Sequence, residues 1–135
     1  MLVNIINQLF EYSNHYIEIR TDPVLPMPAF SIIEKNIYGR FVPIILMNDK
    51  VLTEEKEVMA HILAHEWGHH VLNHIELIRE NNKPSHIERQ NKENEADAYA
   101  AGFIKEFCYS KEPIKKFLKE HPHDLENRLK ILESV

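Results

Sequence analysis

Apolar side chains near the start of the chain recur with the spacing of one helical face. They follow the i, i+3, i+4, i+7 pattern and predict an amphipathic helix that ends before the proline-containing segment 21–28. The positions that carry this pattern are Leu2, Ile5, Ile6, Leu9 and Phe10.

Two short apolar runs follow the proline-containing segment. Residues 29–33 and 41–47 are rich in β-branched and aromatic side chains, and polar residues separate them. They predict a small antiparallel sheet. Because proline has no backbone N–H to donate, we expect Pro43 at an edge position or a bulge of this sheet.

A long helical segment is predicted from Thr53 to about Arg79. Thr53 suits an N-cap, and the two glutamates that follow it would oppose the positive end of the helix dipole. Residues 81–84 then break the chain before Ser85 and Glu88, which form a capping box.

The capping box predicts a second long helix that reaches about Tyr109. Pro113 and Pro122 each suit a first helical turn, so two shorter helices are expected to follow. The pattern as a whole predicts an α+β fold that is mostly helical. At 135 residues we expect one domain, 1–135, because two independent cores would need more apolar surface.

Composition narrows the classes of function. With a net charge of -5 and no stripe of Lys and Arg, the chain is not expected to bind nucleic acid. No apolar run approaches the roughly 20 residues of a membrane span, and the first residues lack signal-peptide features. Cys108 is the single cysteine, so we expect no internal disulfide and a cytoplasmic protein. The oligomeric state stays open.

The segment His65-Glu66-Trp67-Gly68-His69 lies inside the first long helix. Two histidines four residues apart project from one helical face and can share a metal ion. Glu66 is offset beside them, where a carboxylate can accept a proton from water. A chance HExxH match would occur in roughly one such composition in thirty, so a third ligand has to be found independently.

The third ligand is expected on the second long helix. A metzincin site is excluded, because Leu72 and Ile75 stand where that class needs Gly and His. Glu93 and Asp97 share a helical face, so Glu93 can bind the metal while Asp97 orients a histidine ligand. Glu95 is the competing ligand, but it points away from that face.

These blocks resemble the gluzincin peptidases typified by HtpX, Oma and the CAAX prenyl protease. The resemblance includes the HExxH segment, Glu93 with Asp97, and His121-Pro122 followed by Glu126-Asn127-Arg128-Leu129. It implies a zincin-like metallopeptidase domain, in which the HExxH helix packs on the helix of the glutamate ligand. It also implies Zn²⁺ held by His65, His69 and Glu93, with Glu66 as the base.

The resemblance gives His121 one of two roles: it stabilises the oxyanion, or it occupies a fourth metal position. A simple helix cap explains this histidine equally well. Arg128 is expected to pair with a helix carboxylate or to be an exposed charge. Both choices are left open by the sequence.

The predicted function is a zinc endopeptidase that hydrolyses a peptide or protein substrate. One alternative is an ImmA/IrrE-like regulatory peptidase, a class that carries Asn where Asp97 stands. Two others are a zinc-binding regulatory module that cleaves little, and a helical interaction protein in which the motif is accidental. An intact Glu66 favours the enzyme, because a structural zinc site does not need a general base.

Overall fold

The computed structural model of the chain describes residues 1–75 and 85–135, which form a mostly helical α+β structure. No helix in these two ranges combines the length and the apolar character that a bilayer crossing requires. The helices are α1 (Leu2–Ser13), η1 (Asp49–Thr53, a 3-10 helix), α2 (Lys56–Val71), α3 (His86–Glu106), α4 (Glu112–Glu120) and α5 (Leu125–Glu133). The strands are β1 (Glu18–Thr21), β2 (Ala29–Lys35) and β3 (Phe41–Met47).

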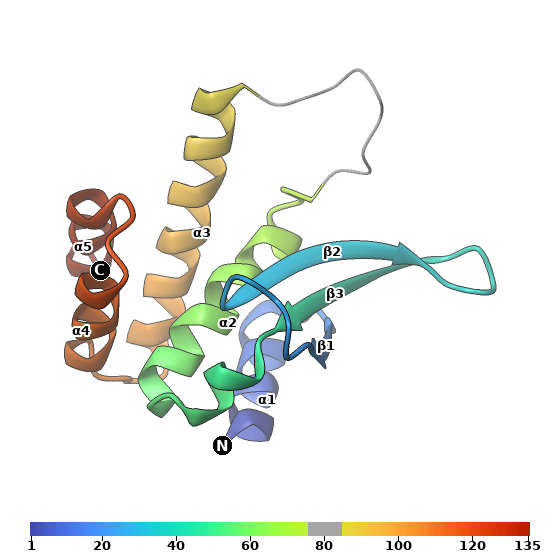
Figure 1. Cartoon of the computed structure of the whole chain (residues 1–135), viewed down its shortest axis with the longest axis horizontal. Helices are drawn as coiled ribbons and strands as arrows, with labels where there is room; N and C mark the ends of the chain where they lie inside the picture. Colours follow the sequence, from blue (N-terminus) through green and yellow to red (C-terminus); the bar gives the residue numbers. More distant parts are fainter. Residues whose placement is uncertain (76–84) are drawn as a thin grey trace.

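Helix α2 lies at the centre of the molecule. It contacts α1, α3 and α4 as well as β2 and β3, so other elements surround it (Figure 1). A helix enclosed in this way needs apolar side chains on all of its faces. Its buried residues are Val58, Met59, Ala60, His61, Ile62, Leu63, Ala64, Trp67, Gly68 and His69. Trp67, Gly68 and His69 of the HExxH segment are therefore buried, whereas His65 and Glu66 are half-buried.

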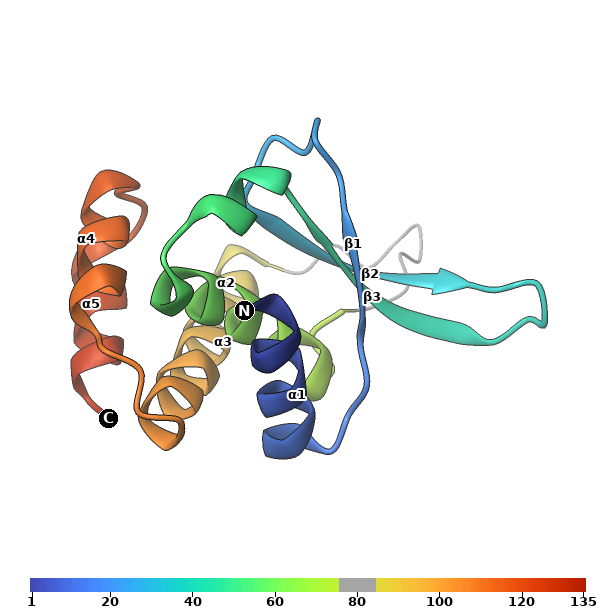
Figure 2. The same cartoon turned by 90° about the horizontal axis from the view of Figure 1, so that it is seen from below.

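The described strands form one mixed sheet of order β1-β3-β2, which packs on one side of α2 while α4 and α5 lie on the other (Figure 2). Strands β2 and β3 pair antiparallel, as predicted, from Ala29↔Met47 to Lys35↔Phe41. Strand β1, which the sequence pattern did not indicate, is parallel to β3, so the sheet as a whole is mixed. The sequence pattern does not indicate β1, because this strand has only four residues and two of them, Glu18 and Arg20, are charged. In the structure Arg20 forms ion pairs with Glu18 and with Glu34 of β2.

Pro43 lies in β3, the central strand. Pairing between β1 and β3 begins one residue later, at Ile44, while Pro43 itself is opposite Ile33 of β2. At this position β2 is therefore the only neighbour among the described strands. Pro43 thus lies in the central strand with continuous register, not in an edge strand or a bulge, and its missing N–H costs no bond to β1 because β1 does not reach this position.

The ends of α2 differ from the prediction. Thr53 does not cap it, because the Thr53 hydroxyl donates to the Lys50 carbonyl at 2.7 Å and closes the preceding 3-10 turn. At the other end α2 stops at Val71 instead of near Arg79, and Asn73 follows with φ 57°. The rest of that expected helix and the break expected at 81–84 lie outside the described residues.

The later helices follow the prediction more closely. The Ser85 hydroxyl accepts a hydrogen bond from the Glu88 N–H at 3.1 Å, and α3 begins there as expected, although it ends before Tyr109. Pro113 lies in the first turn of α4. Pro122 does not lie in a first turn, because α5 begins only after Asp124, which adopts a left-handed conformation.

Gly68 allows α3 to approach α2 closely. A Cβ added to Gly68 would lie 2.9 Å from Cδ1 and 3.0 Å from Cβ of Tyr99, at the root of a side chain that cannot swing away. We expect Gly68→Ala to lower the free energy of unfolding by about 1–3 kcal/mol, as overpacked cores do, although alanine has the higher helix propensity. Urea denaturation of the two proteins measures this difference.

Gly102 of α3 offers the matched control. A Cβ there would meet only the hydroxyl of Tyr12, the far end of a flexible side chain, at 2.9 Å. We expect Gly102→Ala to keep or raise the stability, because alanine gains up to about 1 kcal/mol of helix propensity over glycine. Equal changes in stability for the two substitutions would contradict the close contact at Gly68.

Candidate metal centre

Two helices bring three potential metal ligands together. His65 and His69 come from α2 and Glu93 comes from α3, and one donor atom of each lies within 4.8 Å of the other two. Nε2 of His65 is 3.0 Å from Oε2 of Glu93, and Nε2 of His69 is 3.2 Å from Oε1 of the same carboxylate. The two Nε2 atoms are 3.2 Å apart. This group could hold a metal ion.

The donor set fits a divalent transition metal, because imidazole nitrogens and a carboxylate oxygen are ligands that such ions accept. The group is also open on one side. The side chains of His65 and His69 are 12% and 9% exposed, whereas that of Glu93 is 55% exposed. All three residues line hollows in the surface, so a ligand from solution can reach the donors.

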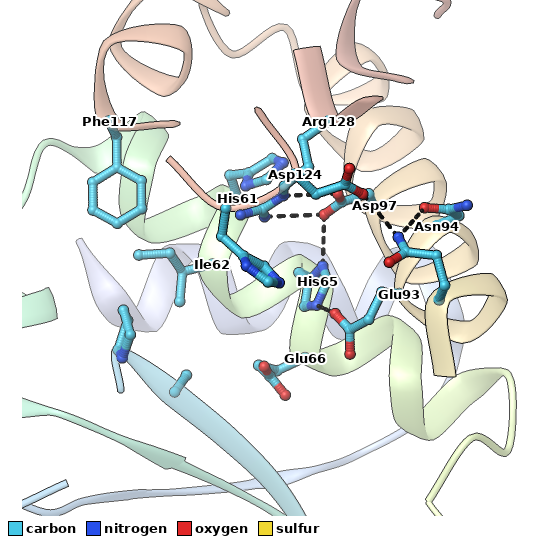
Figure 3. A pocket seen from close by; sticks show the side chains of 14 residues that line it. His61, Ile62, His65, Glu66, Glu93, Asn94, Asp97, Phe117, Asp124 and Arg128 are labelled. Atoms are coloured by element: carbon cyan, nitrogen blue, oxygen red, sulfur yellow. Dashed lines mark hydrogen bonds and ion pairs between the residues drawn. The ribbon is translucent and has the colours of Figure 1, made fainter. Parts of the chain in front are cut away.

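Glu66 lies beside this group and not within it. Its side chain points toward β2 in Figure 3, away from Glu93. The Ser31 hydroxyl of β2 lies 2.5 Å from Oε2 and 3.1 Å from the main-chain oxygen of Glu66. Burial raises the pKa of the Glu66 carboxyl, although His65 and Ser31 oppose the shift. The sequence analysis did not identify Ser31 as a site residue. The one feature that could have indicated it is that Ser31 is polar in an otherwise apolar part of β2.

Asp97 connects His65 to α5. Oδ1 of Asp97 is 2.7 Å from Nδ1 of His65, on the side of the ring opposite Glu93. Arg128 of α5 donates to both carboxylate oxygens of Asp97, at 2.9 and 3.1 Å. Of the two possibilities left open for Arg128, pairing with a helix carboxylate is the one present. Since a planar guanidinium bound in this way fixes the carboxylate plane, Asp97 holds the imidazole in one orientation (Figure 3).

The carboxylates around His65 favour positive charge at this point. Burial opposes the charged imidazole, yet hydrogen bonds to Asp97 and Glu93 raise the pKa of His65 to about 9. The same contacts, with Arg128, lower the pKa of Asp97 to about 2 against the effect of burial. The pKa of Glu93 is likewise lowered by His65 and His69. Without a metal ion, His65 therefore carries a proton between two carboxylates at neutral pH, and a metal ion bound there would have to displace that proton.

The histidines that follow α4 occupy different hollows. His121 is exposed; its Nδ1–H donates to the Phe117 carbonyl at 3.0 Å, and its ring packs on Phe117. It lines a hollow that includes none of the three grouped residues, whereas His123 lines both of the hollows that include them. The active-site role of His121 stays a prediction. No motif in the sequence singles out His123.

The other histidines of α2 are structural. His61 is buried, and burial lowers its pKa to about 3, so it is neutral near physiological pH. Nε2 of His70 is 3.0 Å from the carbonyl oxygen of Ile44, which joins α2 to β3. Neither residue belongs to the three-ligand group. Trp67 is fully buried, and its indole N–H donates to the Ser13 hydroxyl.

The sequence of this chain was compared with models of known protein families. A family described as Peptidase U49 matches residues 3–121, well over half of the chain. The chain belongs to the Peptidase U49 family. Comparison with curated proteins and with solved structures gives no match.

The Peptidase U49 assignment supports the predicted class of activity, hydrolysis of peptide bonds. The matched residues include α2 with its histidine pair and α3 with Glu93. Helix α5 lies beyond them, so Arg128, the partner of Asp97, is outside the matched part of this U49 peptidase. The closer likeness to HtpX, Oma and the CAAX prenyl protease stays a prediction.

Proposed function

We propose that this protein is a zinc-dependent endopeptidase of the gluzincin type. His65, His69 and Glu93 would hold the zinc ion, Glu66 would act as general base, and Asp97 would orient His65. The observation that carries the proposal is the group of three donor atoms within 4.8 Å, beside a separate carboxylate. Membership of a peptidase family supports the reaction type.

Two nitrogens and one carboxylate oxygen are the ligand set of several catalytic zinc sites, which keep a further position free. When bound, zinc would lower the pKa of a water molecule and polarise the substrate carbonyl. Glu66 accepts the proton of the attacking water on its carboxylate and later delivers it to the leaving amine. Its raised pKa suits both transfers, because a base works best when its pKa lies closer to the operating pH.

Ser31 restricts the position of the base. Its hydroxyl contacts Oε2 of Glu66, which leaves the other carboxylate oxygen available for water. For the oxyanion that forms on the substrate, the loop after α4 supplies two candidates, His121 and His123. We favour testing His123 first, because it shares the hollow of the three-ligand group, and His121 second.

Strand β2 supplies a path for an extended substrate. Among the described strands it pairs only with β3, so its other edge is available for main-chain hydrogen bonds. Ala29 lines one of the two hollows that include Glu66, and Phe30 and Ser31 line the other. Both hollows include Glu66 and Glu93, so a peptide paired with β2 would run past the three-ligand group.

The proposal is tested by removing and returning the metal. The purified protein is incubated with a peptide library, and the products are identified by mass spectrometry. We expect cleavage of internal peptide bonds, which a chelator abolishes and about one equivalent of zinc restores.

Two results would contradict this. Undiminished cleavage in the chelated protein would mean that the hydrolysis needs no metal. Absence of cleavage by zinc-loaded protein would favour a zinc-binding regulatory module instead.

A further inference from the structure

The second nitrogen of His69 has a partner that the sequence did not indicate. Nε2 of His69 faces Glu93 and His65, at 3.2 Å from each. Its Nδ1 lies 3.0 Å from Nδ1 of His74. His69 is thus contacted on both sides, as His65 is by Glu93 and Asp97.

The end of helix α2 places His74 against His69. Asn73 adopts φ 57°, and its N–H bonds to the carbonyl of His70 at 3.1 Å. The N–H of His74 bonds to the carbonyl of His69 at 2.8 Å. These two bonds define a Schellman motif, which turns the chain back so that the residue after the turn lies over the last helical turn. His74 occupies that place, and its side chain is only 6% exposed.

A single arrangement of protons satisfies these contacts when Nε2 of His69 binds a metal ion. Nδ1 of His69 then carries the hydrogen and donates, so Nδ1 of His74 accepts. Nε2 of His74 then carries its hydrogen and donates to Oε2 of Glu95, 2.7 Å away on α3. Every hydrogen in this series has an acceptor.

We propose that His74 and Glu95 are positioning residues that hold His69 in the orientation and tautomer needed to bind the metal. The inference rests on the proposed zinc site. His74 contacts Nδ1 of His69 as Asp97 contacts Nδ1 of His65, with an imidazole in place of the carboxylate. Glu95 then holds His74 in place, as Arg128 holds Asp97. Each histidine ligand of α2 is therefore tied back to a neighbouring part of the fold through its second nitrogen.

Zinc affinity measured against a competing chelator dye tests the pair. Loss of such a partner typically weakens metal binding 10–100-fold, and we expect a fall in this range for His74→Leu, which cannot accept a hydrogen bond. His74→Asn should recover much of the affinity, because its side-chain oxygen can accept near the position of Nδ1. Glu95→Ala, at an exposed position, should weaken binding less than His74→Leu.

Two controls separate positioning from folding. Asn73→Gly keeps the left-handed turn, since glycine adopts positive φ freely, and should bind zinc as the wild type does. Urea denaturation of the metal-free variants shows whether any of them is destabilised. In the zinc-loaded wild type, ¹⁵N shifts should show His74 protonated at Nε2 and unprotonated at Nδ1.

The outcomes distinguish this inference from the proposed function. A wild type that binds no zinc contradicts both. Zinc binding by the wild type with equal affinity in His74→Leu overturns the inference alone, as does an equal loss in the Leu and Asn variants. A second zinc ion that disappears in the His74 variants would make His74 a ligand and would also overturn it.

Discussion

Replacing Glu66 with glutamine is expected to reduce peptide cleavage by roughly 10²–10⁴-fold, the usual contribution of a general base. Glutamine has nearly the shape of glutamate, and its amide oxygen can still accept the hydrogen bond of the Ser31 hydroxyl. It cannot take a proton from water. The fold and the packing of α2 on β2 should therefore stay the same while the chemistry is lost.

The zinc content of Glu66→Gln shows whether its activity is lost because the base is missing or because the metal is missing. We expect Glu66→Gln to bind as much zinc as the wild type, because Glu66 is not one of the three grouped ligands. The cleavage rate is measured on the best peptide from the library with both proteins at equal zinc content. Glu57→Gln, the same change in the first turn of α2, is the matched control and should cleave normally. Equal rates for the wild type and Glu66→Gln would remove Glu66 from the mechanism.

The local parts of the site could be predicted from the sequence. His65 and His69 are four residues apart on one helix, so their common face follows from helical geometry. The same argument placed Glu93 and Asp97 together on α3, and the structure brings the two pairs into contact. These are short-range patterns, and the sequence contains them directly.

Contacts between segments that are distant along the chain could not be predicted from such short-range patterns. Ser31 meets Glu66 across 35 positions of the chain, and Arg128 meets Asp97 across 31. Their partners depend on how β2 and α5 pack against the central helices. A polar residue in a strand or an arginine in a final helix suits many environments, so neither identifies its neighbour.

The end of α2 shows how a single residue can override a periodic pattern. Leu72 and Ile75 continue the apolar spacing, which is why the helix was expected to extend further. Asn73 ends it by adopting the left-handed conformation, which asparagine tolerates better than most residues. That turn brings His74 to His69, a contact that an unbroken helix would not make.

Removing the carboxylate of Glu93 is expected to have the largest effect on metal binding. Loss of a group that only orients a ligand weakens binding 10–100-fold, so loss of a ligand itself should cost at least about 100-fold. Glu93→Ala leaves two histidines, whose Nε2 atoms are 3.2 Å apart and lose the oxygens that contact both. Cleavage should disappear with the metal.

The matched control for Glu93→Ala is Glu88→Ala. Glu88 is an exposed glutamate on the same helix, so the change in charge and in side-chain size is the same. It is not among the grouped ligands, and we expect it to bind zinc and cleave peptides as the wild type does. A loss of zinc in both variants would point to the charge of α3 and not to coordination by Glu93.

Elemental analysis of the purified proteins after gel filtration is the most direct test of the proposed metal centre. The account predicts about one zinc ion per chain in the wild type and in Glu88→Ala, and far less in Glu93→Ala. Wild-type protein without zinc, or Glu93→Ala with the full amount, would contradict a centre formed by His65, His69 and Glu93.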